Sequence, residues 1–214
     1  MFYYPRTDSG ALVTAELDIV IKRSKKYGLK LIVGPFVVGQ KTAAWDVTLA
    51  LYETLVAACA NEPGIIGWWI VDEPQEPTLQ PGDLQGIYDD FRALDPDRLI
   101  YINWNFADIK TIAGIEPHGG LQATDIYSTD FYPFTNYPTS ISKGNLESYA
   151  IETIRALRTA RMHGSLGHSW LQLFGTLTAY REPTFVELRN MAYLNFIFGH
   201  GHSYWSVKSL SRWS

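Results

Sequence analysis

The chain has 214 residues, 46% of them hydrophobic and 19% charged, which is enough to bury one core and predicts a single domain over residues 1–214. Its formal net charge of −4, with lysines and arginines scattered along the sequence, argues against a nucleic-acid partner. No segment approaches the ~20 consecutive apolar residues of a membrane helix, and the first residues lack the pattern of a signal peptide, so we expect a soluble protein of undetermined compartment.

Short β-rich runs alternate with longer segments of helical periodicity, a pattern typical of a parallel sheet with crossover helices. A helix over 14–27 ends at Gly28 and precedes a strand over 29–33. The later elements expected, in chain order, are helix 46–60, strand 65–71, helix 83–94, strand 99–104, a short helix near 107–115, strand 126–130, helix 145–162, strand 166–174, a helix opened by a capping box at 184–187, and strand 202–207.

This order predicts an α/β fold of the TIM type, a (β/α) barrel. A complete eightfold barrel takes ~250 residues, so the chain holds about six β/α units and the barrel is incomplete. Because the first recognisable element is a helix, we place the deficit at the N-terminus. A doubly wound open sheet is the alternative. The open sheet edges of an incomplete barrel predict self-association, that is, a homo-oligomer.

Glu73 is the leading catalytic candidate. It follows the strand 65–71, and functional groups of parallel α/β folds gather where strands end. Strict alternation along this strand places Trp69, Val71 and Glu73 on one face, with two apolar side chains beneath the carboxyl group. An aromatic, partly dehydrated setting favours the neutral form of an acid, as general acid catalysis requires.

Three motifs in this order resemble the barrel glycosidases of the large retaining superfamily: Asp72-Glu73-Pro74 after Gly67-Trp68, then Asp130-Phe131-Tyr132-Pro133, then Tyr204-Trp205-Ser206. The resemblance covers the chain from about Leu29 through Trp205. It implies that Glu73 is the acid/base, that Asp72 stands where the superfamily has a sugar-binding Asn, and that Trp205 forms a platform under a sugar ring.

The chain departs from the superfamily at the second carboxylate. At the end of the seventh strand the superfamily has a nucleophilic Glu, whereas this sequence has Gln172, whose amide cannot form a glycosyl ester. Asp130 at the end of strand 126–130 is the best second carboxylate, acting as base or nucleophile. Glu182 is a weaker candidate, and a structural or sugar-binding role for Asp130 stays open.

Sugars are bound by aromatic faces and by planar amides or carboxylates, which gives the substrate-binding candidates Asp72, Asn103, Asn105, Tyr132, Gln172 and Trp205. We expect neither a metal nor an organic cofactor, because His200 and His202 precede the last strand without a carboxylate at ligand spacing. The leading prediction is therefore a glycoside hydrolase acting on a carbohydrate. A carbohydrate-binding barrel without catalysis is the alternative, and a serine esterase using Ser169 is a more remote one.

Overall fold

The computed structural model describes residues 2–3, 14–34, 37–38, 53–73, 81–105, 124–134, 146–173, 175 and 180–205. The chain divides into two compact units. Unit 1 comprises Met1–Asn103 with Pro117–Asp125, and unit 2 comprises Trp104–Glu116 with Ile126–Ser214. The expected helix near 107–115 lies outside the described residues. The expectation of one domain stays a prediction.

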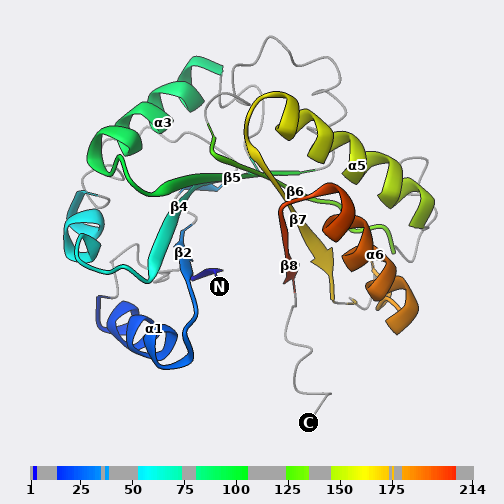
Figure 1. Cartoon of the computed structure of the whole chain (residues 1–214), viewed down its shortest axis with the longest axis horizontal. Helices are drawn as coiled ribbons and strands as arrows, with labels where there is room; N and C mark the ends of the chain where they lie inside the picture. Colours follow the sequence, from blue (N-terminus) through cyan, green and yellow to red (C-terminus); the bar gives the residue numbers. More distant parts are fainter. Residues whose placement is uncertain are drawn as a thin grey trace. The chain divides into compact units, whose positions relative to one another are not determined.

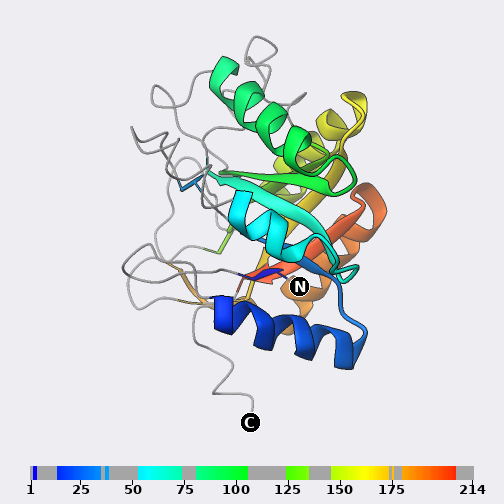
Figure 2. The same ribbon diagram turned by 90° about the vertical axis from the view of Figure 1, so that its left-hand side faces the viewer.

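Unit 1 is a parallel sheet with its helices on one face (Figure 1). The neighbouring strands are β1 (Phe2–Tyr3), β2 (Leu31–Val33), β4 (Ile65–Asp72) and β5 (Leu99–Asn105), and β3 (Val37–Val38) also pairs with β4. Helix α1 (Thr14–Tyr27), the helical residues 53–59 and α3 (Pro81–Leu94) follow one another along the sheet in Figure 2.

The helices of unit 1 end, and bury apolar side chains, at the positions that the periodicity predicts. Helix α1 packs with Leu17 and Ile21 buried and exposes its lysines, and it stops at Gly28, whose φ of 64° is a conformation that glycine adopts without strain. Cys59 is fully buried, and burial raises the pKa of its thiol to about 11, which makes it an inert core residue.

Arg98 ties together the starts of β4 and β5. Its guanidinium donates to the carbonyl oxygens of Ile65 and Cys59, both at 2.9 Å, and to the Asp95 carboxylate. Asp95 also accepts the indole N–H of Trp68 at 3.0 Å, and the Arg98 guanidinium lies 5.6 Å from the centre of the Trp68 ring. Trp68 therefore faces the helical side of the sheet, where α3 ends.

Unit 2 is a second set of parallel strands, β6 (Ile126–Asp130), β7 (Leu166–Gln172) and β8 (Gly201–Trp205). Helices α5 (Leu146–Met162) and α6 (Phe185–Phe198) contact each other and both pack on β7, so they share one face. Their core is formed by Phe131, Phe134, Tyr149, Leu171 and Met191. The capping box of α6 is confirmed, since Thr184 and Glu187 bond reciprocally.

Two expectations are corrected by these elements. The first element is the short strand β1 rather than a helix, and β7 ends at Gln172 rather than at residue 174. Within each unit the helices cover one face of the strands, whereas a doubly wound sheet carries helices on both faces. None of the helices in the described part of the chain has the length and apolar character needed to cross a bilayer.

Candidate functional site at the strand ends

A β-bulge interrupts β4 just before its end. Trp69 pairs with Tyr101 of β5, but Val71 already pairs with Ile102, so Ile70 is an extra residue in β4. The indole N–H of Trp69 donates to the carbonyl oxygen of Val71 at 2.9 Å across the bulge. Bulges of this kind are over-represented beside active sites because they change the direction of a side chain.

The bulge reverses the alternation that the sequence predicts for this strand. After it, Asp72 pairs with Asn103, and Asn103 lies two residues beyond Tyr101, so Asp72 shares a face with Trp69. The expected alignment of Trp69, Val71 and Glu73 on one face is therefore wrong. Because Trp68 faces the helices, Trp69 and Asp72 face the side of the sheet away from them.

Asp72 and Asn103 form a polar pair on this helix-free face. The amide nitrogen of Asn103 donates to the carboxylate of Asp72 at 3.0 Å, and only 2% of Asn103 is exposed. Within the described residues the side-chain oxygen of Asn103 has no hydrogen-bond partner. A buried acceptor left over in this way is rare in folded proteins, and a ligand hydroxyl is the kind of group that satisfies it.

Glu73 leaves the strand in a strained conformation. Its φ is 47°, making it the one non-glycine residue with positive φ in the described part of the chain. This left-handed region costs a residue other than glycine about 1–2 kcal/mol. The backbone N–H of Glu73 donates to the carbonyl oxygen of Asn103 at 2.8 Å and holds the turn in place. The side chain is half-buried. Strain of this sort collects at functional sites.

Aromatic rings lie directly beneath the Asp72–Asn103 pair. Trp69 and Tyr101 are both buried and meet edge to face, with ring centres 5.3 Å apart. At the end of β2, Gly34 passes so close to Trp69 that a Cβ would lie 2.1 Å from the Trp69 carbonyl oxygen. Only glycine fits there, so the floor under the polar pair is tightly packed.

In unit 2, Asp130 ends β6 on the face away from the helices. It pairs in register with Trp170, which lies two residues beyond His168 on β7, and His168 in turn bonds Ser128 across the same face. Asp130 is half-buried. Tyr132 follows it, half-buried, and meets Tyr180 edge to face at 6.2 Å.

Two further predicted sugar ligands are placed only by their backbone. Asn105 is the last residue of β5 and Trp205 is the last residue of β8, where Trp205 pairs with Gln172. The side chains of both lie outside the described part of the structure, so their role stays a prediction.

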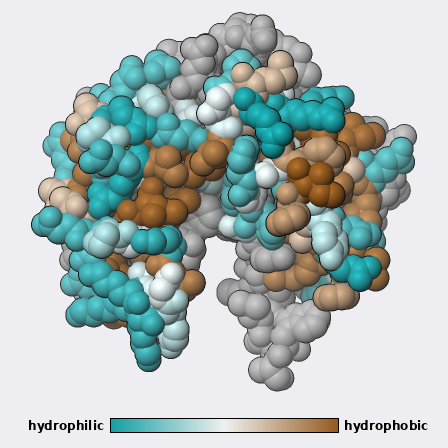
Figure 3. Space-filling view, viewed as in Figure 1, coloured by the Kyte–Doolittle hydropathy of each residue, from teal (hydrophilic) through white to brown (hydrophobic). Residues whose placement is uncertain are grey.

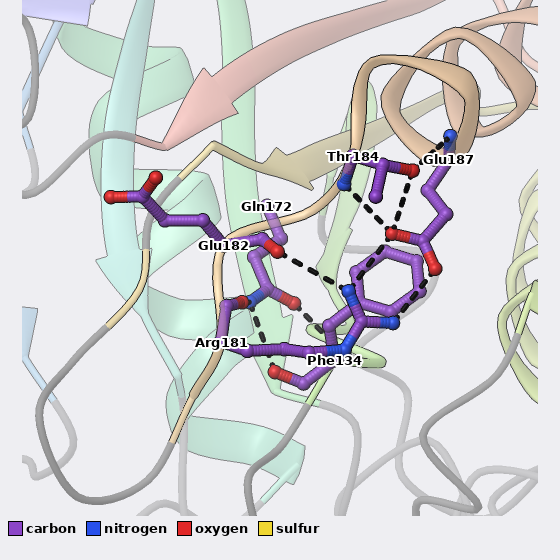
Figure 4. A network of polar contacts seen from close by, with 6 residues as sticks. All are labelled: Phe134, Gln172, Arg181, Glu182, Thr184 and Glu187. Carbon is purple, nitrogen blue, oxygen red and sulfur yellow. Dashed lines mark hydrogen bonds and ion pairs between the residues drawn. The ribbon is translucent and has the colours of Figure 1, made fainter.

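Gln172 is fully buried and bonds to the backbone of two loops (Figure 4). Its side-chain oxygen accepts the N–H of Phe134 at 3.0 Å. Its amide group donates to the carbonyl oxygens of Phe134 at 3.2 Å and Arg181 at 2.9 Å. In this position the amide joins the loop after β6 to the loop after β7, and its role as a sugar ligand stays a prediction.

Arg181 extends this network towards α6. Its guanidinium makes two hydrogen bonds to the Glu187 carboxylate, at 2.9 and 2.7 Å, and lies 4.4 Å from the centre of the Phe134 ring. These bonds and those from Thr184 lower the pKa of Glu187 to about 2. In Figure 4 the carboxylate of the neighbouring Glu182 points away from this network. The Glu182 side chain is exposed.

His168 links three strands of unit 2 through hydrogen bonds of its buried ring. Its Nδ1 lies 2.8 Å from the hydroxyl of Ser128 on β6, and its Nε2 lies 3.2 Å from the hydroxyl of Ser203 on β8. Burial, with a smaller effect of His202, lowers the pKa of His168 to about 3. An imidazole that stays neutral to such low pH holds strands together and is a poor general base.

Ser169, the residue on which an esterase would depend, lies inside β7 and on its opposite face. Its hydroxyl lies 3.4 Å from that of Tyr149 on α5, and burial raises the pKa of Tyr149 to about 12. A strand-internal serine beside a neutral phenol lacks both the sharp turn and the base of a serine hydrolase.

The His200-Gly201-His202 segment also makes backbone contacts. The ring Nδ1 of His200 accepts the N–H of Gly167 at 2.9 Å, and the backbone N–H of His200 donates to the carbonyl oxygen of Gly167 at 2.8 Å. Across the described ranges, no group of three or more His, Cys, Asp or Glu side chains is arranged to hold a metal ion.

Several features of these strand ends could not be predicted from the sequence. A bulge depends on how two strands pair, so nothing within residues 65–72 alone signals it. The hydrogen bonds of His168 to Ser128 and Ser203 likewise join three strands. Period-two counting from a known register would have found them, because His168 pairs with Ser128 in β6.

The structure resembles several solved glycoside hydrolases, although no protein-family model and no curated protein sequence matches the chain. A β-glucuronidase from Bacteroides uniformis superposes with a TM-score of 0.66 at 13% identity over 96% of this chain. Fungal β-1,4-galactanases superpose with 0.59 at 16% identity over 96%, and an endoglucanase from Pseudomonas stutzeri with 0.58 at 18% identity over 92%.

These similarities establish the fold. The chain spans 26% of the glucuronidase chain, 76% of the galactanase chain and 67% of the endoglucanase chain. It has the parallel β/α architecture of these enzymes, an incomplete TIM-type barrel, as the sequence predicts. In barrels of this type the functional residues lie at the carboxyl ends of the strands. Asp72 and Glu73 lie at the carboxyl end of β4, and Asp130 lies at that of β6.

Proposed function

We propose that this chain is a glycoside hydrolase barrel in which Glu73 is the general acid and Asp130 the second carboxylate. The observation that carries the proposal is the end of β4: a bulge, a strained Glu73 and a buried Asp72–Asn103 pair with a spare acceptor oxygen. The strain at Glu73 and the unsatisfied oxygen of Asn103 cost stability, and Glu73 directly follows Asp72, whose pair with Asn103 is suited to sugar hydroxyls.

Asp72 and Asn103 bind the substrate in this proposal. A sugar hydroxyl donates to the spare oxygen of Asn103, while Asp72 holds the Asn103 amide in its orientation. The aromatic floor of Trp69 and Tyr101 keeps water away from beneath the pair, which strengthens these hydrogen bonds. Asp130 supports the second role because it ends β6 on the helix-free face.

The experiment compares hydrolysis of aryl glycosides that differ in leaving group. A general acid matters most when the leaving group is poor. Glu73→Gln should therefore lose at least ~100-fold in kcat/KM on poor leaving groups and much less on a dinitrophenyl glycoside. Glu53→Gln, an exposed glutamate in the helical residues 53–59, is the matched control and should match wild type.

Asp130 is tested separately. Asp130→Asn should abolish turnover of both substrate classes, because a base or nucleophile is needed whatever the leaving group. If the two carboxylates act on one sugar, the double variant loses no more than the worse single variant. Equal loss by Glu73→Gln on all leaving groups, or full activity of Asp130→Asn, would contradict the assigned roles.

The buried contacts of Gln172 favour a second candidate, a barrel that binds carbohydrate without cleaving it. The superfamily position for the nucleophile holds an amide bonded to three backbone groups, so it supplies no carboxylate. Calorimetric titration with oligosaccharides distinguishes the two candidates. Binding that weakens ~10-fold or more in Asn103→Leu, without turnover, would support the binding barrel and overturn the hydrolase.

A further inference from the structure

Helix α6 carries large apolar side chains on its outward face as well as its inward face, unlike helices α1 and α5. Helices α1 and α5 expose mainly charged residues, as amphipathic surface helices do. One face of α6 packs inward through Met191 and Asn195, with Leu188 and Leu194 against the core of unit 2. A helix with large apolar side chains on opposite faces is normally covered on both.

The outward face of α6 is nonetheless exposed. Its large side chains are Phe185, Val186, Tyr193, Phe196 and Ile197, which are 74%, 53%, 59%, 81% and 62% exposed. Spacings of three and four residues place them, with Arg189, along one stripe about 20 Å long. Hydrophobic atoms gather over the C-terminal part of α6 in Figure 3.

We propose that this α6 stripe is the interface with a second copy of the chain, packed antiparallel against the same stripe. An aromatic side chain offers roughly 150–250 Å², so the stripe presents on the order of 700 Å². A stable interface buries about 800 Å² per partner, and exposed apolar patches of more than a few hundred Å² mark interaction sites. The area matches what a dimer needs.

The order of residues along the stripe favours a second copy over another partner. Tyr193 lies between two apolar pairs, Phe185 with Val186 and Phe196 with Ile197. In an antiparallel pair centred midway between Arg189 and Tyr193, Arg189 of one copy faces Tyr193 of the other, and the two apolar pairs face each other. The single charged side chain of the stripe then meets an aromatic ring, a favourable contact, and never its own copy.

One flank of the stripe is already covered within the chain. Helix α5 covers one side of α6, where the guanidinium of Arg158 lies 5.8 Å from the centre of the Phe198 ring. At the start of α6, Glu187 is paired with Arg181. The surface left for a partner is therefore the stripe itself, which runs along the length of the helix.

Sedimentation velocity tests the proposal on the whole 214-residue chain. Wild type should show a dimer that dissociates on dilution from about 200 to about 5 µM, and Phe196→Glu should weaken association at least ~100-fold. The matched control is Ile151→Glu on α5, also half-exposed, which should leave the dimer intact. Circular dichroism verifies that both variants are folded.

Cross-linking tests the proposed geometry independently. Mixing Arg189→Cys chains with Tyr193→Cys chains places two thiols opposite each other, with Cα atoms within the ~7 Å that a disulfide spans, while native Cys59 is buried. We expect an oxidised dimer from the mixture and little from either variant alone. A wild type that stays monomeric throughout, or a dimer unaffected by Phe196→Glu, would overturn the proposal.

Discussion

Replacing Gln172 with glutamate would restore a carboxylate at the superfamily's nucleophile position. The hydrogen bonds of Gln172 predict that this substitution lowers the stability of the fold. The amide is 0% exposed and donates to two carbonyl oxygens, of Phe134 and Arg181. A carboxylate keeps the acceptor bond from the Phe134 N–H but loses both donors. It also places a negative charge against two carbonyl oxygens in the interior.

The expected cost follows from these contacts. Each lost hydrogen bond removes about 1 kcal/mol, and each buried group left without a partner costs a further ~1–3 kcal/mol. Gln172→Glu should therefore lower the free energy of unfolding by about 3–5 kcal/mol at neutral pH. Gln172→Met has a similar volume and no charge but loses all three hydrogen bonds, so it should cost at least as much and serves as the control for lost hydrogen bonds without a buried charge.

Urea unfolding, followed by tryptophan fluorescence at several pH values, measures both variants. Burial raises the pKa of the new carboxyl in the folded state, and its protonated form can donate one hydrogen bond. The stability of Gln172→Glu relative to Gln172→Met should therefore be highest at low pH and fall as pH rises. A Gln172→Glu variant within 1 kcal/mol of wild type at neutral pH, or one that gains glycosidase turnover, would refute this reasoning.

Three further variants test other parts of the structure. The pKa of His168 is about 3 in the folded state and ~6.5 when unfolded, so stability falls as pH drops from 6.5 towards 3, by about 2–3 kcal/mol at pH 4.5, and His168→Gln should flatten this part of the urea-unfolding profile. Arg98→Ala should cost on the order of 3–5 kcal/mol in thermal and urea unfolding, because it removes the cation paired with the buried Asp95 carboxylate and a donor to several carbonyl oxygens, while Arg98→Lys should cost less. Glu73→Gly should be about 1 kcal/mol more stable than Glu73→Ala, since glycine adopts a φ of 47° without strain, and both should lack turnover.

Three results would contradict these expectations for His168, Arg98 and Glu73. An unchanged pH slope in His168→Gln would assign the acid sensitivity to carboxylates. Arg98→Ala with the stability of wild type would mean that the guanidinium contacts contribute nothing net. Glu73→Ala as stable as Glu73→Gly would remove the evidence for strain at this position.

The element order was predictable because burial periodicity is a local property. Helix α1 was expected over 14–27 and spans Thr14–Tyr27, and the capping box at Thr184 and Glu187 forms as expected. These features depend on residues within one or two turns of each other. The short β1 was missed, since two residues carry no periodicity.

The candidate site was predictable in position but only partly in orientation. The residue types at the ends of β4, β5 and β6 marked Glu73, Asn103 and Asp130, because strand ends carry function in parallel α/β folds. Strict alternation failed in β4, where the bulge at Ile70 shifts the face of every later residue. The bonding of Gln172 depends on two loops brought together by folding, which no local pattern reveals.

The two ends of strand β4 differ: its start is held by several hydrogen bonds, and its carboxyl end is strained. At its start, the Ile65 carbonyl oxygen accepts from Arg98, whose side chain is only 12% exposed and binds several groups at once. At its end lie a bulge, a left-handed glutamate and a buried amide oxygen without a described partner. The pairing with β2 also shifts register near the start of β4, between Ile65 and Gly67, but the left-handed residue and the buried oxygen without a described partner lie at the carboxyl end. Natural proteins break local rules where function requires it. The hydrogen bonds at the start of β4 hold the strand in place and so offset the conformational strain at its carboxyl end. For this reason we assign function to Glu73 and its neighbours rather than to the equally polar cluster around Arg98.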